Sequence, residues 1–119
     1  MKTIILISLL MLSACSSGVA QLIKSAADTS ATVSEITQNL LESDVISVDQ
    51  AKQVHTTIEV QVLPRIGKAE AAYSEWRLQY EVYGLNNNGD KTAEQYILFA
   101  NDYIRGLCFQ LNLEFCQEN

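Results

Sequence analysis

The sequence predicts an all-α protein, an elongated antiparallel three-helix bundle or helical hairpin whose long central helix is kinked at Pro64. Three observations predict this class. Apolar residues recur three or four positions apart along most of the chain, which is the spacing of one helix face. A turn at 44–47 and a polar loop at 84–91 divide this pattern into three segments. Pro64 is the only proline in 119 residues, so little else interrupts the segments.

The first helix is predicted at about 19–43. Its expected seam alternates steps of three and four residues, as in a heptad repeat. The seam comprises Val19, Leu22, Ala26, Thr29, Val33, Ile36 and Leu40. Ala26 and Thr29 bury little surface, so packing of this helix against a partner or a second copy is left open.

The second helix is predicted at about 48–84, and Ser47 with Gln50 fits a capping box at its start. Its expected inward face comprises Ala51, Val54, Ile58, Val62, Ile66, Ala69, Tyr73, Trp76, Tyr80 and Tyr83. The middle steps of this face are all four residues long, and Pro64 has no N–H to donate. We therefore expect a kink near 60–64, or alternatively a break into two helices after Pro64.

The third helix is predicted at about 92–111, capped by Asp90 or by Thr92 with Gln95. Its inward face comprises Tyr96, Ala100, Tyr103, Leu107 and Leu111, with Ile97, Ile104, Cys108 and Phe115 beside it. The tail beyond this helix also alternates apolar and polar residues, as a strand does, but no partner strand is evident. Short connections make neighbouring helices antiparallel.

The first residues form a short apolar run behind Lys2. This run is too short to span a bilayer, which takes about 20 residues, and it is typical of a signal peptide. It ends in Leu12-Ser13-Ala14-Cys15. This order resembles the lipobox of bacterial lipoproteins. The resemblance implies cleavage between Ala14 and Cys15 and attachment of fatty acyl chains such as palmitate at Cys15. An ordinary signal peptide with an incidental cysteine is the alternative.

The resemblance divides the chain into a signal peptide (1–14), a lipidated tether (15–18) and a helical domain (19–119). It implies a membrane-anchored, extracytoplasmic protein. In a Gram-negative cell, Ser16 after the cysteine resembles the signal for transfer to the outer membrane, facing the periplasm. Loss of Lys2 with the leader takes the net charge from −6 to −7. That charge argues against nucleic acid as a partner.

Two cysteines, Cys108 and Cys116, remain for a disulfide, which an oxidising compartment permits. Eight residues of straight helix rise about 12 Å, but a disulfide tolerates at most about 7 Å between Cα atoms. If the two cysteines are bonded, the third helix must therefore end near 110–112 and the tail must fold back.

All nine aromatic residues lie between 73 and 115. Their tyrosines suggest a binding face, because each hydroxyl needs water or a polar partner. The proposed face comprises Tyr73, Trp76, Tyr80, Tyr83, Tyr96 and Tyr103. The alternative is the core of the second hairpin, where Tyr83 would lie near Tyr96, Tyr80 near Phe99 or Ala100, and Trp76 near Tyr103. This aromatic end is expected to lie far from the membrane.

No nucleophile elbow, phosphate loop or metal-ligand cluster is evident, so we expect no catalytic residue, no cofactor and no metal site. The expected function is that of an envelope lipoprotein acting through contacts with a protein partner or with itself. One alternative is a phage- or plasmid-type lipoprotein for blocking, exclusion or lysis. Another is a small-ligand carrier, with a pocket lined by Tyr73, Trp76, Tyr80, Tyr103 and Leu107.

Overall fold

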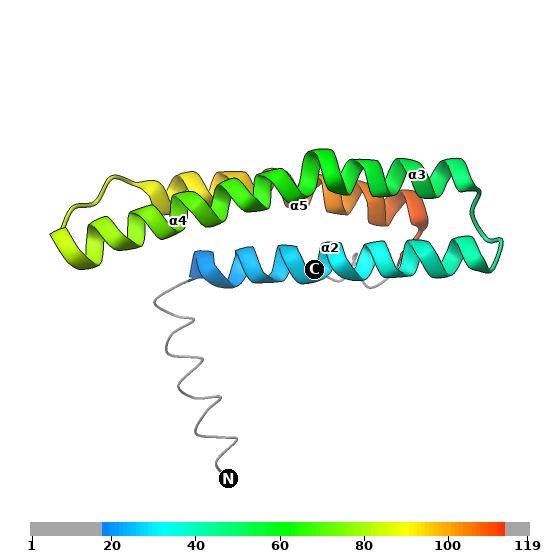
Figure 1. Cartoon of the computed structure of the whole chain (residues 1–119), viewed down its shortest axis with the longest axis horizontal. Coiled ribbons are helices and arrows are strands. Elements are labelled where there is room, and N and C mark those ends of the chain that lie inside the picture. Colours follow the sequence, from blue (N-terminus) through cyan, green and yellow to red (C-terminus); the bar gives the residue numbers. More distant parts are fainter. Residues whose placement is uncertain (1–17, 114–119) are drawn as a thin grey trace, which may run out of the picture.

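The computed structural model describes residues 18–113, and they form an antiparallel bundle of three helical rods (Figure 1). The first rod is α2 (Gly18–Glu42). The second runs through α3 (Val48–Thr57), η1 (Ile58–Val62) and α4 (Leu63–Tyr83), and the third is α5 (Gly89–Leu111). The all-α elongated bundle with one long central helix is therefore confirmed, and its longest dimension is 53 Å. Among the described residues, none of the helices is long and apolar enough to cross a membrane.

The central rod is continuous across Pro64, but its turns widen just before that residue. Over Ile58–Val62 the rod is a π-helix, in which the Leu63 N–H donates to the carbonyl of Ile58. Proline cannot donate to the carbonyl one turn earlier, and a wider turn accommodates the missing bond. The predicted irregularity at Pro64 is thus a π-turn, and the alternative of two separate helices is wrong.

The π-turn also explains the four-residue steps in the sequence. A π-turn holds more residues than an α-turn, so steps of four stay on one face through this segment. Accordingly, the predicted inward residues are buried through the whole middle of the rod. They are Ala51, Val54, Ile58, Val62, Ile66 and Ala69. Ser47 caps the rod through the predicted box with Gln50.

The seam of α2 lies one residue later than predicted at three of its positions. Its buried residues are Ile23, Ala26, Ser30, Val33 and Thr37, so the predicted Leu22, Thr29 and Ile36 are not central, and Leu22 is 39% exposed. The two buried hydroxyls donate to carbonyls of their own helix, Ser30 to Ala27 at 2.9 Å and Thr37 to Val33 at 2.6 Å. They are thereby satisfied without a polar partner across the bundle. Ser30 and Thr37 can therefore occupy buried positions of the seam. A prediction that counted only apolar residues placed the seam one residue too early there.

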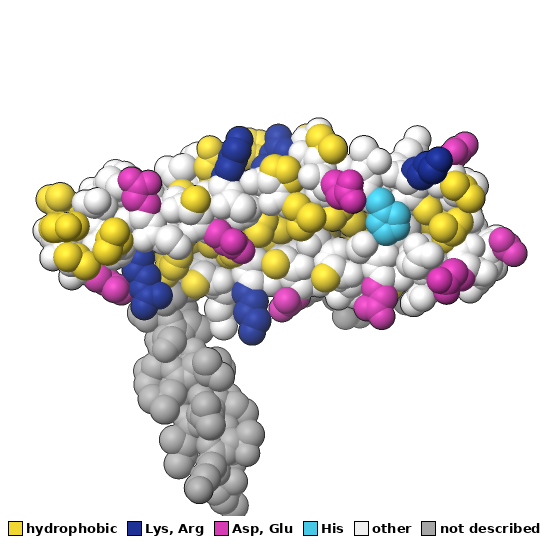
Figure 2. Space-filling view, in the orientation of Figure 1, with side chains coloured by type: hydrophobic (Ala, Val, Ile, Leu, Met, Phe, Trp, Pro, Cys, Tyr) yellow, Lys and Arg dark blue, Asp and Glu magenta, His cyan; other side chains and the backbone are white. Residues whose placement is uncertain are grey.

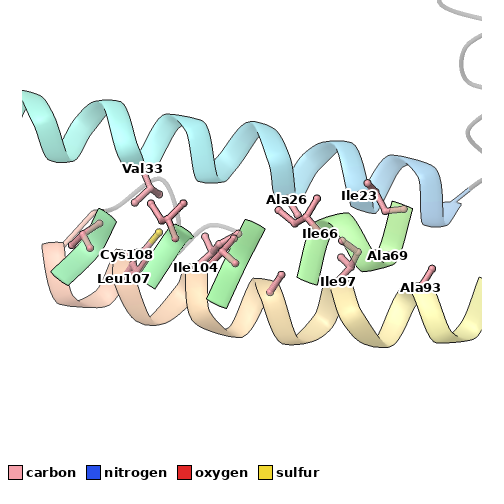
Figure 3. Packing of buried hydrophobic residues seen from close by; sticks show 14 residues of the cluster. Ile23, Ala26, Val33, Ile66, Ala69, Ala93, Ile97, Ile104, Leu107 and Cys108 are labelled. Atoms are coloured by element: carbon pink, nitrogen blue, oxygen red, sulfur yellow. The ribbon is translucent and has the colours of Figure 1, made fainter. Parts of the chain in front are cut away.

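The core is narrow and aliphatic. Figure 3 shows side chains of α2, α4 and α5 meeting along the bundle axis, with Ile97 of α5 pointing toward Ile66 and Ala69 of α4. Five of the buried residues are alanines, and none of those in the described part is aromatic. Alanine lets helix axes approach closely but buries few atoms. Each larger core side chain therefore contributes a large share of the buried apolar surface.

Helix α5 begins at Gly89, three residues earlier than predicted. Its N-cap is Asn88, in the left-handed conformation and without a side-chain cap bond, so the expected caps at Asp90 and Thr92 are wrong. The loop itself replaces them, because the Asn87 side chain accepts a hydrogen bond from the Gly89 N–H at 2.9 Å. Such asparagine turns satisfy a helix start from outside the helix.

Helix α5 ends at Leu111, within the predicted 110–112. Asn112 turns the backbone into the left-handed region at φ 57°. The Leu113 N–H donates to the carbonyl of Cys108 at 2.9 Å, and the Asn112 N–H to that of Phe109 at 3.1 Å. These two bonds form a Schellman motif, which ends the helix and satisfies two of its last carbonyls.

Candidate functional site

The two residues of the predicted processing site, Ala14 and Cys15, lie outside the described residues, and so does Cys116. Cys108 is 1% exposed and disulfide-bonded. Its partner sulfur belongs to one of the two cysteines outside the described part. The pairing with Cys116 stays a prediction; α5 ends at Leu111, within the limit that this pairing requires.

The last two turns of α4 project beyond the start of both neighbouring helices (Figure 1). All the large apolar side chains from position 78 to 85 are more than half exposed there. We call this group the apolar tip: Leu78 (54%), Tyr80 (52%), Val82 (62%), Tyr83 (64%) and Leu85 (58%). Figure 2 shows hydrophobic side chains gathered at this end of the molecule. Tyr80 and Tyr83 continue the inward stripe of α4, but no helix lies opposite them.

Trp76 marks where the overhang begins. Its ring stacks on Tyr80 with centroids 5.3 Å apart, and its Nε1 donates to Asn86 Oδ1 at 2.9 Å. This hydrogen bond therefore holds the loop between α4 and α5 against the last turn of α4 that α5 covers. Gly89 lies so close that a Cβ built on it would stand 2.8 Å from the Trp76 Cβ. This contact sets the point at which α5 starts.

The predicted aromatic pairs across the hairpin are wrong, because the loop returns sooner than expected. Trp76 lies against Gly89 and not Tyr103. Tyr103 instead lies under the guanidinium of Arg65, 5.0 Å from ring centroid to Cζ, and Tyr96 has the Lys68 ammonium 5.8 Å from its centroid. Both are cation–π contacts, which stabilise by about 0.5–1 kcal/mol when exposed. The predicted face is therefore divided in two: Tyr73, Trp76 and Tyr80 form a continuous stack along α4, whereas Tyr96 and Tyr103 lie under cations of the same helix.

Tyr73 and Trp76 also line an open hollow of about 470 Å³ where α2, α4 and α5 meet. Its walls include Gly18, Val19 and Leu22 of α2, Tyr73 and Trp76 of α4, and Asp90 and Glu94 of α5. Tyr103 and Leu107, which were expected in one pocket with Tyr73, are not among its walls, and Leu107 is 4% exposed in the core. The pocket of the ligand-carrier alternative is thus not assembled as predicted. Asp90 Oδ1 is buried without a hydrogen-bond partner among the described residues.

The hollow also fixes which end of the bundle is aromatic. Gly18 and Val19, at the start of α2, lie beside Tyr73 and Trp76. The aromatic end is therefore the end at which the chain enters α2 from Cys15. The aromatic residues were expected at the end of the bundle far from the start of the first helix and so far from a membrane; that placement is wrong, because in an up-down-up bundle the end of the second helix returns to the start of the first.

A second apolar surface lies along the solvent side of α5. We call it the outer face of α5, comprising Leu98 (48% exposed), Phe99 (58%), Tyr103 (37%) and Phe109 (80%). The buried side chains of the same helix, such as Ile97 and Ile104, point the other way, toward α4 and α2. An α-helix of this kind is apolar on more of its circumference than its own bundle covers.

The charges near the apolar tip neutralise each other. Arg77 Nε lies 3.0 Å from Glu81 Oε1, four residues on along α4. This hydrogen bond, together with the attraction of the opposite charge, raises the pKa of Arg77 above its ordinary value. No other Lys, Arg, Asp or Glu lies between 77 and 89. The tip therefore carries no net charge.

Neither a family model nor a curated protein nor a solved structure matches this chain. Sequence reasoning missed Leu78, Val82 and Leu85 of the tip, since they lie off the helical stripe. One signal was present in the helix lengths. Counting back from the turn at 44–47, residue 19 stands opposite residue 72, so the last turns of the second helix must extend beyond the start of the first.

Proposed function

We propose that this chain is a membrane-anchored, extracytoplasmic lipoprotein that acts without catalysis, by binding another protein through the outer face of α5. The anchor rests on the sequence Leu12-Ser13-Ala14-Cys15. The contact rests on one observation, the exposure of Phe99 and Phe109 on a helix whose opposite side already forms the core.

The exposed side chains of α5 suit a protein partner in spacing and in size. Phe99 and Tyr103, four residues apart, share one side of α5, and Leu98 and Phe109, eleven residues apart, share the adjoining side. Anchors spaced along one helix face are a common way for a helix to fit the groove of another protein. Burying a side chain such as phenylalanine contributes about 1.5–3 kcal/mol, and a few such residues carry most of an interface's affinity.

The anchor is tested by replacing Cys15 with alanine. We expect incorporation of labelled palmitate to be lost and residues 1–14 to remain on the chain, which intact mass measurement reads directly. The label is the better readout, because an uncleaved apolar leader can itself hold a chain at the membrane. Cys116→Ala is the matched control and should keep full labelling. Equal labelling of the Cys15→Ala variant would contradict the lipoprotein assignment.

The contact is tested by placing a photo-crosslinking residue at Asp102, an exposed position between Phe99 and Phe109. We expect a discrete adduct with a second protein, reduced at least tenfold by Phe99→Ser and Phe109→Ser together. Both positions are more than half exposed, so the fold should survive these changes. Val48→Ser, at an equally exposed position on α3, is the control and should leave the adduct intact. An adduct at twice the chain's own mass, or none, would contradict the proposal.

A further inference from the structure

We propose that the apolar tip of α4 enters the interface of the lipid bilayer that holds the acyl anchor. This inference rests on the proposed lipidation of Cys15. It assigns the tip a single partner, a phospholipid membrane surface, and it gives the bundle an orientation in which α4 points at the membrane.

The first argument is reach. Cys15 is three residues from Gly18, and three extended residues span about 10 Å. The start of α2 is therefore held within about that distance of the lipid surface. Tyr73 lies beside Val19, and Tyr83 follows ten residues later along α4, a rise of about 15 Å. With the bundle upright, the overhang is longer than the tether, so the tip passes the level of Cys15.

The second argument is composition. The tip combines leucine and valine with two tyrosines, and the only charged residues from 77 to 89, Arg77 and Glu81, are paired. Leucine and valine favour the edge of the hydrocarbon region, while a tyrosine places its ring there and its hydroxyl among the headgroups. Three polar residues, the asparagines at 86–88, directly follow Leu85 of the tip in the chain. No unpaired charge within the tip has to be removed from water when the tip enters the interface.

The third argument is the contrast with the opposite end of the bundle. The connection between α2 and α3 carries Glu42, Asp44 and Asp49 without a basic residue between them. Anionic headgroups repel such a group and do not repel the neutral tip. Charge and tether length therefore favour the same orientation.

Trp76 is a built-in probe for this inference, because it is the only tryptophan of the chain and it stacks on Tyr80 of the tip. The experiment uses the full lipidated protein in vesicles of phosphatidylethanolamine and phosphatidylglycerol at 3:1. We expect a nitroxide placed at headgroup depth to quench Trp76 emission at least twofold. We also expect aqueous iodide to quench Trp76 of this protein less than it quenches Trp76 of the lipidated variant Leu78→Asn, Val82→Asn, Tyr83→Asn in the same vesicles.

The variant Leu78→Asn, Val82→Asn, Tyr83→Asn should lose the nitroxide quenching while keeping palmitate and membrane attachment. All three positions are exposed, so helix α4 should persist. Val45→Asn with Val48→Asn, equally exposed at the opposite end, should change nothing.

Two results would overturn the inference. One is palmitate present with Trp76 open to iodide and insensitive to the nitroxide. The other is protection of Trp76 that rises with the number of protein copies per vesicle, which would make the tip a contact between chains. Absence of palmitate at Cys15 would instead overturn the proposed anchor, so the two failures are distinguishable.

Discussion

Replacing Ile97 with alanine is expected to lower the free energy of unfolding by about 2–5 kcal/mol. Ile97 is 0% exposed and is the largest of the described side chains that are fully buried. In a narrow core made largely of alanine, isoleucine and valine, the neighbouring helices cannot close the space that its missing atoms leave. A small domain has only about 5–15 kcal/mol of stability, so the loss is severe.

The measurement is thermal and urea unfolding of the Ile97→Ala chain, followed by helical circular dichroism and Trp76 emission. We expect the unfolding midpoint to fall by about 10–20 °C. The control is the next residue along the chain, since Leu98 is 48% exposed on the outer face of α5. Leu98→Ala should stay within about 0.5 kcal/mol of the parent. Similar losses at both positions would mean that α5 packs with a different face inward.

Replacing Gly89 with alanine is expected to destabilise the bundle by about 1–3 kcal/mol, which is the usual range for forcing an extra carbon into a packed contact. The new Cβ would stand 2.8 Å from the Trp76 Cβ and 3.1 Å from the carbonyl oxygen of Ala72. Neither atom is the free end of a flexible side chain. The start of α5 must therefore move away from α4, and the hydrogen bond from Trp76 to Asn86 should weaken.

The same substitution at two other glycines is expected to have the opposite sign. Gly67 and Gly106 lie within helices, and a Cβ at either would meet nothing within 4 Å. Alanine there should stabilise by about 0.5–1 kcal/mol, because it restricts the unfolded chain and favours the helix. Urea midpoints of the three variants check the prediction. Stabilisation by Gly89→Ala would show that α5 does not start against Trp76.

Gly106 adds a link to the proposed contact, since it lies between Tyr103 and Phe109 on α5. If a partner covers this face closely, Gly106→Ala gains stability alone but loses affinity in the complex. The apolar tip, proposed to meet the membrane, and the outer face of α5, proposed to bind a protein, are separate surfaces, so both contacts can form at once. The bundle would then stand on the membrane and present α5 along its side.

The helices themselves followed from local rules. The capping box at Ser47, the stripe from Ala51 to Ala69 and the irregularity at Pro64 all depend on neighbours within one or two turns. These features are encoded in residue spacing and in the missing N–H of proline. The start of α5 was missed because the asparagines of the loop cap it from outside the helix.

The aromatic site was harder to predict, because it depends on how the rods align. Where the third helix starts against the second is set by the contact of Gly89 with Trp76 and by the bond from Trp76 to Asn86. Because α5 is aligned on α4 by that contact, Tyr103 lies against Arg65, and no helix lies opposite Tyr80. Periodicity shows which face of a helix is apolar, but not whether a neighbour is long enough to cover it.

By itself the sequence determined that the described part of the chain is all-helical, where its three rods lie and which residues from Ala51 to Ala69 of the central rod face inward. Turn signals and helical spacing act over a few residues, so they can be read without the fold. Only the tertiary structure decided that the aromatic end lies at the start of α2, and that α4 overhangs both neighbours. Both depend on contacts between different helices. One of these contacts requires a glycine, because Gly89 at the start of α5 lies directly against Trp76 of α4.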